Sequence, residues 1–424
     1  MWKKIIQIWK IRDLRNSILF VMGMLIIFRI AAHIPIPGVD SVALKSLFDS
    51  NQLLGLMNVF SGGSMENFSI VLLGIAPYIT ASIIFQLLTM VVPKLEELSK
   101  EGEYGRQKIN QWTRWLTVPL AFFQSFATIS LLRQSAVNVL PNYSSWEVFT
   151  AMITITAGTV FLMWIGELIS EKHIGNGISL LIFAGIVSGL PGSVGSTLYT
   201  YDQAQIINMV IFALISLVTI VGVVIITEGQ RNIPVSYARK VRGNKVYGGV
   251  DTHLPLRVNQ AGVIPIIFAI AIIMFPPLIA QLFIRVKTVW IANAAEWVIQ
   301  IFQNQLFYGI SYFVMVVAFT YFYTAVIFHP DQIAENLQKQ GGFVPGIRPG
   351  KNTAAYLQKI VTRIVFTGAL FLGIIAVLPL ITAQITNTQS LVVGGTSLLI
   401  VVSVVIEMFG QINSQLSMRD YEEI

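Results

Sequence analysis

Cysteine is absent from this 424-residue sequence, and charged residues are scarce. Without cysteine the chain can form no disulfide, carry out no thiol chemistry and build no cysteine-based metal site. Its four histidines (His33, His173, His253 and His329) follow neither HExxH nor HxH spacing, so a histidine-based metal site has little support. Only 12% of the residues are charged, whereas 54% are hydrophobic. This composition, with a mean hydropathy of +0.70, is typical of a polytopic membrane protein and not of a soluble domain.

Long apolar segments predict ten membrane-spanning helices. We expect them at residues 17–36, 70–92, 115–132, 148–166, 174–190, 204–227, 258–284, 301–328, 364–380 and 391–406. The last two come from one uncharged run, which the polar residues 382–390 divide with a predicted turn. We expect Pro191 to truncate the fifth span, and Pro77 lies inside the second.

The distribution of lysine and arginine predicts the orientation of these spans. If the chain starts on the cytoplasmic side, 23 of its 28 basic residues lie in cytoplasmic segments and four in outer loops, with Arg29 in the first span. Both termini are therefore predicted to be cytoplasmic, and the net charge of +7 needs no nucleic-acid partner to explain it. The first 16 residues read as an amphipathic helix on the inner leaflet, since Trp2, Ile5, Ile6 and Trp9 share one face. A cleaved signal peptide is the disfavoured alternative. If the segment were removed, no later segment would restore the excess of basic residues on the cytoplasmic side.

Ten spans with both ends on one side allow a division into two five-helix halves. Because five is odd, such halves must be inverted relative to each other in the membrane. We expect them at residues 17–190 and 204–410, with an external hinge loop at 191–203 and a short tail at 411–424. Inverted halves commonly place a path at their interface, which suggests a transporter or a channel.

Two long loops, both predicted to be cytoplasmic, contain residues that favour ordered turns. In residues 228–257, alternating apolar and polar residues predict a β-hairpin around Gly243-Asn244 with basic residues at its tip. In residues 329–360, a helix over 331–340 should end at Gly341-Gly342, and the following PGIRPG turn should display Arg348. These loops could serve only to set topology. Turns of this kind in long loops are more often functional, so we favour a docking surface.

Five long motifs together resemble the SecY family, the channel subunit of the bacterial protein translocase. They are FSGGSMENFSIVLLGIAPYITASIIFQLL, MWIGELISEKHIGNGISLLIFAGIVSGLP, DTHLPLRVNQAGVIPIIFA, GGFVPGIRPGKNTA and VVGGTSLLIVVSVVIE. The resemblance runs from about residue 12 to residue 407. It implies an all-α fold in which two inverted five-helix halves close like a clamshell around an hourglass pore.

The resemblance also implies a plug and a lateral gate. The segment around 58–69 matches the family's plug, a short helix that closes the outer funnel; its residues are Phe60, Ser61, Gly62, Gly63, Ser64, Met65, Glu66, Asn67 and Phe68. A Gly-Gly hinge and a polar, water-facing side suit a segment that must leave its seat. The gate positions are Thr80, Ser82 and Gln86 on the second span and Phe268 and Ile270 on the seventh. Pro77 and the Thr80/Ser82 surface should keep packing at the gate loose.

The family's pore ring transfers to six isoleucines: Ile75, Ile79, Ile182, Ile186, Ile267 and Ile400. A narrow ring of branched aliphatic side chains offers no ligand to an ion and tends to lose its water, so it should block ions. The docking positions are Lys240, Arg242, Lys245 and Arg348. At the hairpin tip Asn244 stands where many relatives carry a second basic residue, which weakens its case as an electrostatic contact.

The partners implied are two small single-span subunits of the SecE and SecG type, the SecA motor ATPase, the ribosome, preprotein signal sequences with their nascent chains, and membrane lipid. No cofactor, metal or catalytic residue is expected. A secondary transporter of a small solute is the alternative, but it would need charged or strongly polar groups near the midplane. The few candidates include Arg29 and His33, which lie near the outer half of the first span, where snorkelling or a helix partner explains them as well. An intramembrane protease would need a Ser–His pair, two membrane aspartates or a metal motif, and the fourth to eighth spans supply none in register.

Overall fold

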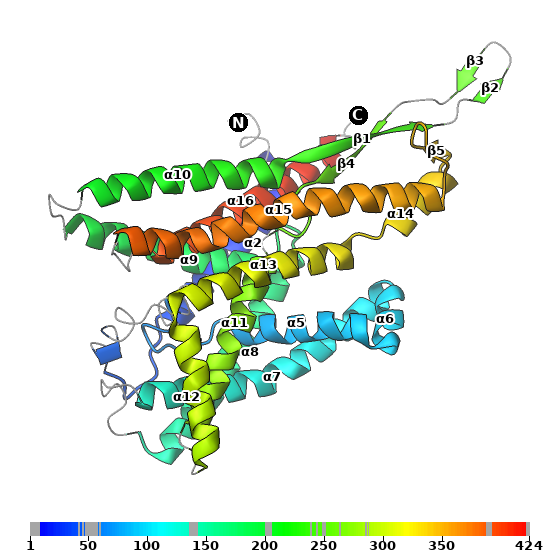
Figure 1. Cartoon of the computed structure of the whole chain (residues 1–424). Coiled ribbons are helices and arrows are strands. Elements are labelled where there is room, and N and C mark those ends of the chain that lie inside the picture. The colour runs from blue at the N-terminus through cyan, green and yellow to red at the C-terminus, as the bar shows by residue number, and fades with distance from the viewer. Residues whose placement is uncertain are drawn as a thin grey trace.

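A computed structural model describes residues 9–40, 43–44, 46, 58, 61–134, 143–199, 206–237, 240–242, 245–247, 252–262, 264–284, 286, 288–386 and 392–420. Within these residues ten long helices coincide with the ten expected spans. They are α2 (Arg12–Ala32), α5 (Ala76–Val91), α7 (Glu103–Gln134), α8 (Ser145–Ser170), α9 (Gly177–Tyr199), α10 (Ile206–Glu228), α11 (Ile264–Phe283), α13 (Gln305–Ile327), α15 (Lys351–Thr386) and α16 (Val392–Asp420). Most of them lie side by side in one bundle (Figure 1).

Six helices in the described part of the chain are individually long and apolar enough to cross a membrane. A seventh candidate pairs α5 with α6 (Pro93–Lys100), which bend by 102° at their junction. The outward faces are apolar as well: on α10, Leu214, Leu217 and Val218 are each at least 60% exposed. Such surfaces suit a lipid environment, where no water competes for the backbone hydrogen bonds of a helix.

The structure places two prolines differently from what the sequence indicated. Pro77 lies within the range of the predicted span, but residues 70–75 form turns and α5 begins at Ala76, which places Pro77 in the first turn of the helix. A proline is favoured there, since its missing N–H would have no helical acceptor. Pro191 does not truncate α9, which continues through it to Tyr199. The predicted hinge loop at 191–203 is therefore helical as far as Tyr199, and the rest of it lies outside the described residues.

Three other expected boundaries also change. The predicted outer loop at 285–300 contains helix α12 (Val289–Gln303), whose Trp290 and Trp297 are largely exposed. The first part of the turn expected over 382–390 is helical, since α15 continues to Thr386, and residues 387–390 lie outside the described part. Residues 12–16, assigned to a separate surface helix, are the first turn of α2, and residues 1–8 are not among those described.

Both long loops fold at the end of the bundle where α6 also lies (Figure 1). The predicted hairpin is confirmed: β2 (Lys240–Arg242) pairs antiparallel with β3 (Lys245–Tyr247). It extends from a larger pair formed by β1 (Gln230–Tyr237) and β4 (Thr252–Arg257). The predicted helix at 331–340 is α14 (Pro330–Lys339), followed by β5 (Gly342–Phe343).

Strand β1 joins the two loops into one body. It pairs with β4 on one side and, through Ser236 and Tyr237, with β5 on the other, which gives a three-stranded sheet of order β4-β1-β5. Side chains from the sheet, including Ile233 and Leu256, are buried against Leu357 and Val361 of α15. The sheet is therefore fixed to the N-terminal part of α15.

Two glutamines of α16 connect the predicted halves near this end of the molecule. The side chain of Gln411 accepts a hydrogen bond from the backbone N–H of Gly175 (2.5 Å), and Gln415 donates to the carbonyl of His173 (2.8 Å). Both acceptor and donor backbones belong to the short connection between α8 and α9. The α8–α9 connection therefore contacts the last helix of the chain directly.

Candidate functional site

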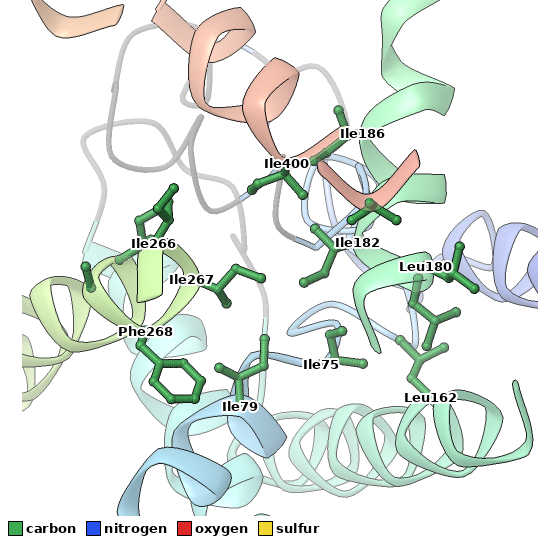
Figure 2. Packing of buried hydrophobic residues seen from close by; sticks show 14 of the residues in the cluster. Ile75, Ile79, Leu162, Leu180, Ile182, Ile186, Ile266, Ile267, Phe268 and Ile400 are labelled. Atoms are coloured by element: carbon green, nitrogen blue, oxygen red, sulfur yellow. The ribbon is translucent and has the colours of Figure 1, made fainter. Parts of the chain in front are cut away.

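Six isoleucines from four helices meet in the largest buried cluster of the protein. Ile75 is the N-cap of α5, Ile79 lies in its first turns, and the others come from α9, α11 and α16. None is more than 8% exposed, and Ile400 is completely buried. Figure 2 shows Ile75, Ile79, Ile182, Ile186, Ile267 and Ile400 gathered around one centre. The structure thus brings together all six predicted ring residues.

The chemistry of this centre is that of an aliphatic barrier. Branched side chains supply no charge and no hydrogen bond, so an ion there would lose its hydration without compensation. The same side chains make no specific bond to a polypeptide. Among the described residues, no group of three or more histidines or acidic residues could hold a metal ion. The centre therefore suits a seal better than a binding pocket.

The predicted plug segment lies directly beside this centre. Residues 61–69 form consecutive turns and are mostly buried, with Ser64 and Phe68 at most 1% exposed, while Phe60 lies outside the described residues. Glu66 and Asn58 close the segment on itself, since the Glu66 N–H donates to Asn58 Oδ1 (3.0 Å). Asn67 Nδ2 lies 3.5 Å from the carbonyl of Ala32. The polar side chains predicted to face water are thus largely used in contacts within the protein.

Two backbone hydrogen bonds hold the far end of the segment. The Ile36 N–H donates to the Phe68 carbonyl (2.9 Å), and the Ile70 N–H donates to the Ile34 carbonyl (3.0 Å). Met65 and Phe68 pack in a second buried cluster with residues of α7 and α8, among them Ile129 and Ile155. The segment is therefore seated and is not loosely tethered.

Gly62 of the plug segment and Gly185 of α9 bring two backbones into close contact. Gly62 has φ +72°, and a Cβ built on Gly185 of α9 would lie only 2.4 Å from the Gly62 Cα. A methyl group at either position would collide with the other backbone. Sequence reasoning missed Gly185, although its place one residue before a ring isoleucine was the available signal.

The predicted gate residues lie on two helices that contact each other, α5 and α11. The Thr80 hydroxyl donates to the Ala76 carbonyl one turn earlier in the same helix (3.0 Å). Gln86 Nε2 donates to Ser82 Oγ (3.3 Å), which leaves two polar side chains joined along α5. On α11 both Phe268 and Ile270 are buried. The Phe268 ring stands edge-on to rings of α13, 6.0 Å from that of Phe319, so α13 supports this side of the seam.

The Arg348 turn is rigid and projects from the sheet. Val344 is part of the buried cluster under the sheet, and Ile347 packs against that cluster. The Thr353 hydroxyl donates a hydrogen bond to the Arg348 carbonyl (2.9 Å). Gly346 and Gly350 both adopt positive φ, as tight turns require. The Arg348 side chain is exposed. Lys240, Arg242 and Lys245 lie on the strands of the β2–β3 hairpin, on the same loop system.

Comparison with known proteins agrees with this architecture. The SecY family profile matches residues 69–409. A protein translocase subunit SecY of Halalkalibacterium halodurans is 43% identical, with 100% of this chain and 99% of that protein aligned. The chain belongs to the SecY family. The SecY of Vibrio cholerae is 41% identical over 97% of this chain and 94% of its own length.

Solved structures of channels share the fold at lower identity. A protein-conducting channel aligns with a TM-score of 0.63 and 19% identity, covering 93% of this chain and 91% of its own. Sec61 from a canine ribosome–channel complex gives a TM-score of 0.61 at 18% identity, with the same two coverages. The predicted fold class, ten spanning helices in the arrangement of this family, is thereby confirmed. The relatives are translocase subunits and the neighbours are channels, so the chain is assigned no enzymatic activity of its own.

Proposed function

We propose that this chain is the central channel subunit of a preprotein translocase in the cytoplasmic membrane. Unfolded polypeptides pass through the ring of six isoleucines, and signal or transmembrane helices leave sideways between α5 and α11. The observation that carries the proposal is the convergence of the six isoleucines, from four separate helices, in one buried cluster of a SecY-family chain.

The seal and the gate follow from this arrangement. At rest the aliphatic ring and the plug segment 58–69 exclude ions, and an incoming chain displaces the plug and fills the ring itself. The halves at residues 17–190 and 204–410 part at the seam between α5 and α11. We place both termini in the cytoplasm, because 23 of 28 basic residues then lie on that side.

The partners proposed are those of a translocase. Two small single-span subunits of the SecE and SecG type would surround the helix bundle. The β2–β3 hairpin and the Arg348 turn would dock a motor ATPase of the SecA type or a ribosome. A solved relative of the fold, Sec61, is part of a ribosome–channel complex, which supports the ribosome as one such partner.

A crosslinked gate tests the proposal. Because the chain has no cysteine of its own, cysteines at Ser82 and Phe268 can be joined by a short bifunctional reagent without background. We expect the joined pair to block both secretion of a preprotein and insertion of a membrane protein, whereas either single-cysteine variant keeps both activities. Full secretion through a quantitatively crosslinked seam would refute the lateral exit.

A further inference from the structure

Arg29 is a cation within a spanning helix whose side chain turns toward the plug segment. It lies in the last turn of α2, where a positive charge is favourable near the helix C-terminus. A long basic side chain in that position commonly extends to the membrane surface. Here instead its Nη1 donates a 2.7 Å hydrogen bond to the carbonyl of Gly62, which is 33 residues away in sequence. Intramembrane charges are costly and usually serve a function.

The acceptor of this bond belongs to a residue that packs closely against two helices. Gly62 is held between α2 and α9: a Cβ on it would lie 2.9 Å from the Phe28 ring and 2.9 Å from the Gly185 Cα. Phe28 precedes Arg29 in sequence and is 3% exposed. The charge-assisted bond from Arg29 to the Gly62 carbonyl therefore adds a polar contact to a residue that already packs against both helices.

We propose that Arg29 is the positioning residue that holds the plug closed, by binding the Gly62 carbonyl in the resting channel. The inference rests on the proposed function, since it assigns a role within the channel's seal. For the plug to leave, this bond must break, so Arg29 shifts the equilibrium between seated and displaced plug toward the seated state.

His33 provides the matched control. It follows Arg29 by one helical turn, and its Nδ1 bonds to the Arg29 carbonyl (2.8 Å) within the same helix. Its side chain is exposed. Replacing His33 therefore alters a polar side chain on the same face of α2 without removing the bond to Gly62.

Cysteine labelling measures how readily the plug segment leaves its buried position. Met65 is 2% exposed, so a Met65→Cys reporter in full-length protein, reconstituted with its small subunits, should react slowly with a water-soluble maleimide. Adding Arg29→Met should raise the labelling rate about tenfold, the factor that corresponds to a loss of about 1.4 kcal/mol. Arg29→Lys keeps the charge but loses the planar guanidinium group, so it should give an intermediate rate. His33→Gln should leave the rate unchanged.

The outcomes separate this inference from the proposed function. Gly185→Ala, which crowds Gly62 sterically, shows that the reporter responds to a displaced plug. If Gly185→Ala accelerates labelling and Arg29→Met does not, the role of Arg29 is overturned while the channel stands. Equal acceleration by His33→Gln and Arg29→Met would also overturn it. Failure of the unmodified chain to translocate a preprotein in the same vesicles would instead refute the proposed function.

Discussion

At the ring positions, side-chain chemistry matters more than side-chain size. Asparagine is smaller than isoleucine, but it brings an amide that keeps water in a narrow constriction. We expect Ile182→Asn and Ile400→Asn to increase ion leak at rest, about tenfold for each 1.4 kcal/mol by which hydration lowers the barrier. They should also ease the export of precursors with poorly matched signal sequences. Planar-bilayer recording and an export assay check this, and unchanged leak with unchanged selectivity in both variants would remove these residues from the ring.

The contact between Gly185 and Gly62 yields a steric prediction. Gly185→Ala would place a Cβ 2.4 Å from the Gly62 Cα, so either the plug segment or α9 must shift. Overpacking of this kind typically costs about 1–3 kcal/mol. We expect a leaky channel that is still inserted in the membrane.

Gly189→Ala is its control on the same helix, because a Cβ there meets no atom of the described residues within 4 Å. Equal conductance of both variants and the unchanged chain would show that the glycine contact does not seat the plug.

Residue identities at the ring could be predicted from sequence only through the family resemblance. Taken singly, Ile79 or Ile400 is indistinguishable from any lipid-facing isoleucine, since hydropathy does not report which face of a helix points inward. The sequence does not indicate the roles of Arg29 and Gly185 either, because these depend on contacts that are distant in sequence. Both contact Gly62 of the plug segment, which is distant from each of them in sequence, and single-sequence reasoning cannot supply such contacts.

At the scale of elements, the proposed docking surface is one folded unit made from two loops. Hairpin chemistry around Gly243-Asn244 and the helix stop at Gly341-Gly342 predicted its parts correctly. The pairing of β1 with β5 joins residues about 100 positions apart, and the turn signals within each loop do not indicate it.

The prolines and α12 show where local signals fail. A proline reads as a helix breaker in sequence, yet its effect depends on its position: Pro77 lies in the first turn of α5, and Pro191 lies inside α9. Within a membrane, neighbouring groups can satisfy the backbone that a proline leaves unpaired. Hydropathy predicts a loop where α12 lies, because Arg285, Lys287 and Glu296 interrupt the apolar run that a spanning helix requires.

The Arg348 turn gives the prediction at this scale. Because the turn is anchored by Val344 and Thr353, its guanidinium is presented in a fixed place and can bond two oxygen atoms of a partner's carboxylate or phosphate. We expect Arg348→Glu to abolish motor-driven translocation without unfolding the protein. Loss of such a bond costs about 2–5 kcal/mol where the partner group is left buried and unpaired. Arg348→Lys should rescue only in part.

Lys339→Glu serves as the matched control for charge reversal. Lys339 is 69% exposed and pairs with Glu335 on α14 at 2.8 Å, an exposed ion pair of the kind that contributes little. Motor binding and translocation of a model preprotein should be nearly normal in this variant. Normal transport by all three variants, or failure of Arg348→Glu through degradation alone, would leave the turn as a topology signal only.

On the scale of the whole molecule, a ring of isoleucines makes a channel only if the translocating chain passes through it. The helices that supply the ring also contact elements of both halves, and the α8–α9 connection is bonded to α16 through Gln411 and Gln415. Movement of one half would therefore change the ring and the seam together. The central claim is that the substrate's path runs through the ring and not along the lipid-facing surface.

Disulfide trapping of an arrested preprotein tests this claim most directly. A preprotein with one cysteine is stalled by a folded C-terminal domain in vesicles that contain Ile79→Cys, Ile400→Cys or Leu217→Cys, the last a lipid-facing position of α10 that is 64% exposed. We predict substrate disulfides with Ile79→Cys and Ile400→Cys as the substrate cysteine reaches the ring, and none with Leu217→Cys. Translocation without a crosslink to either ring position, or an equal yield at Leu217→Cys, would contradict the account.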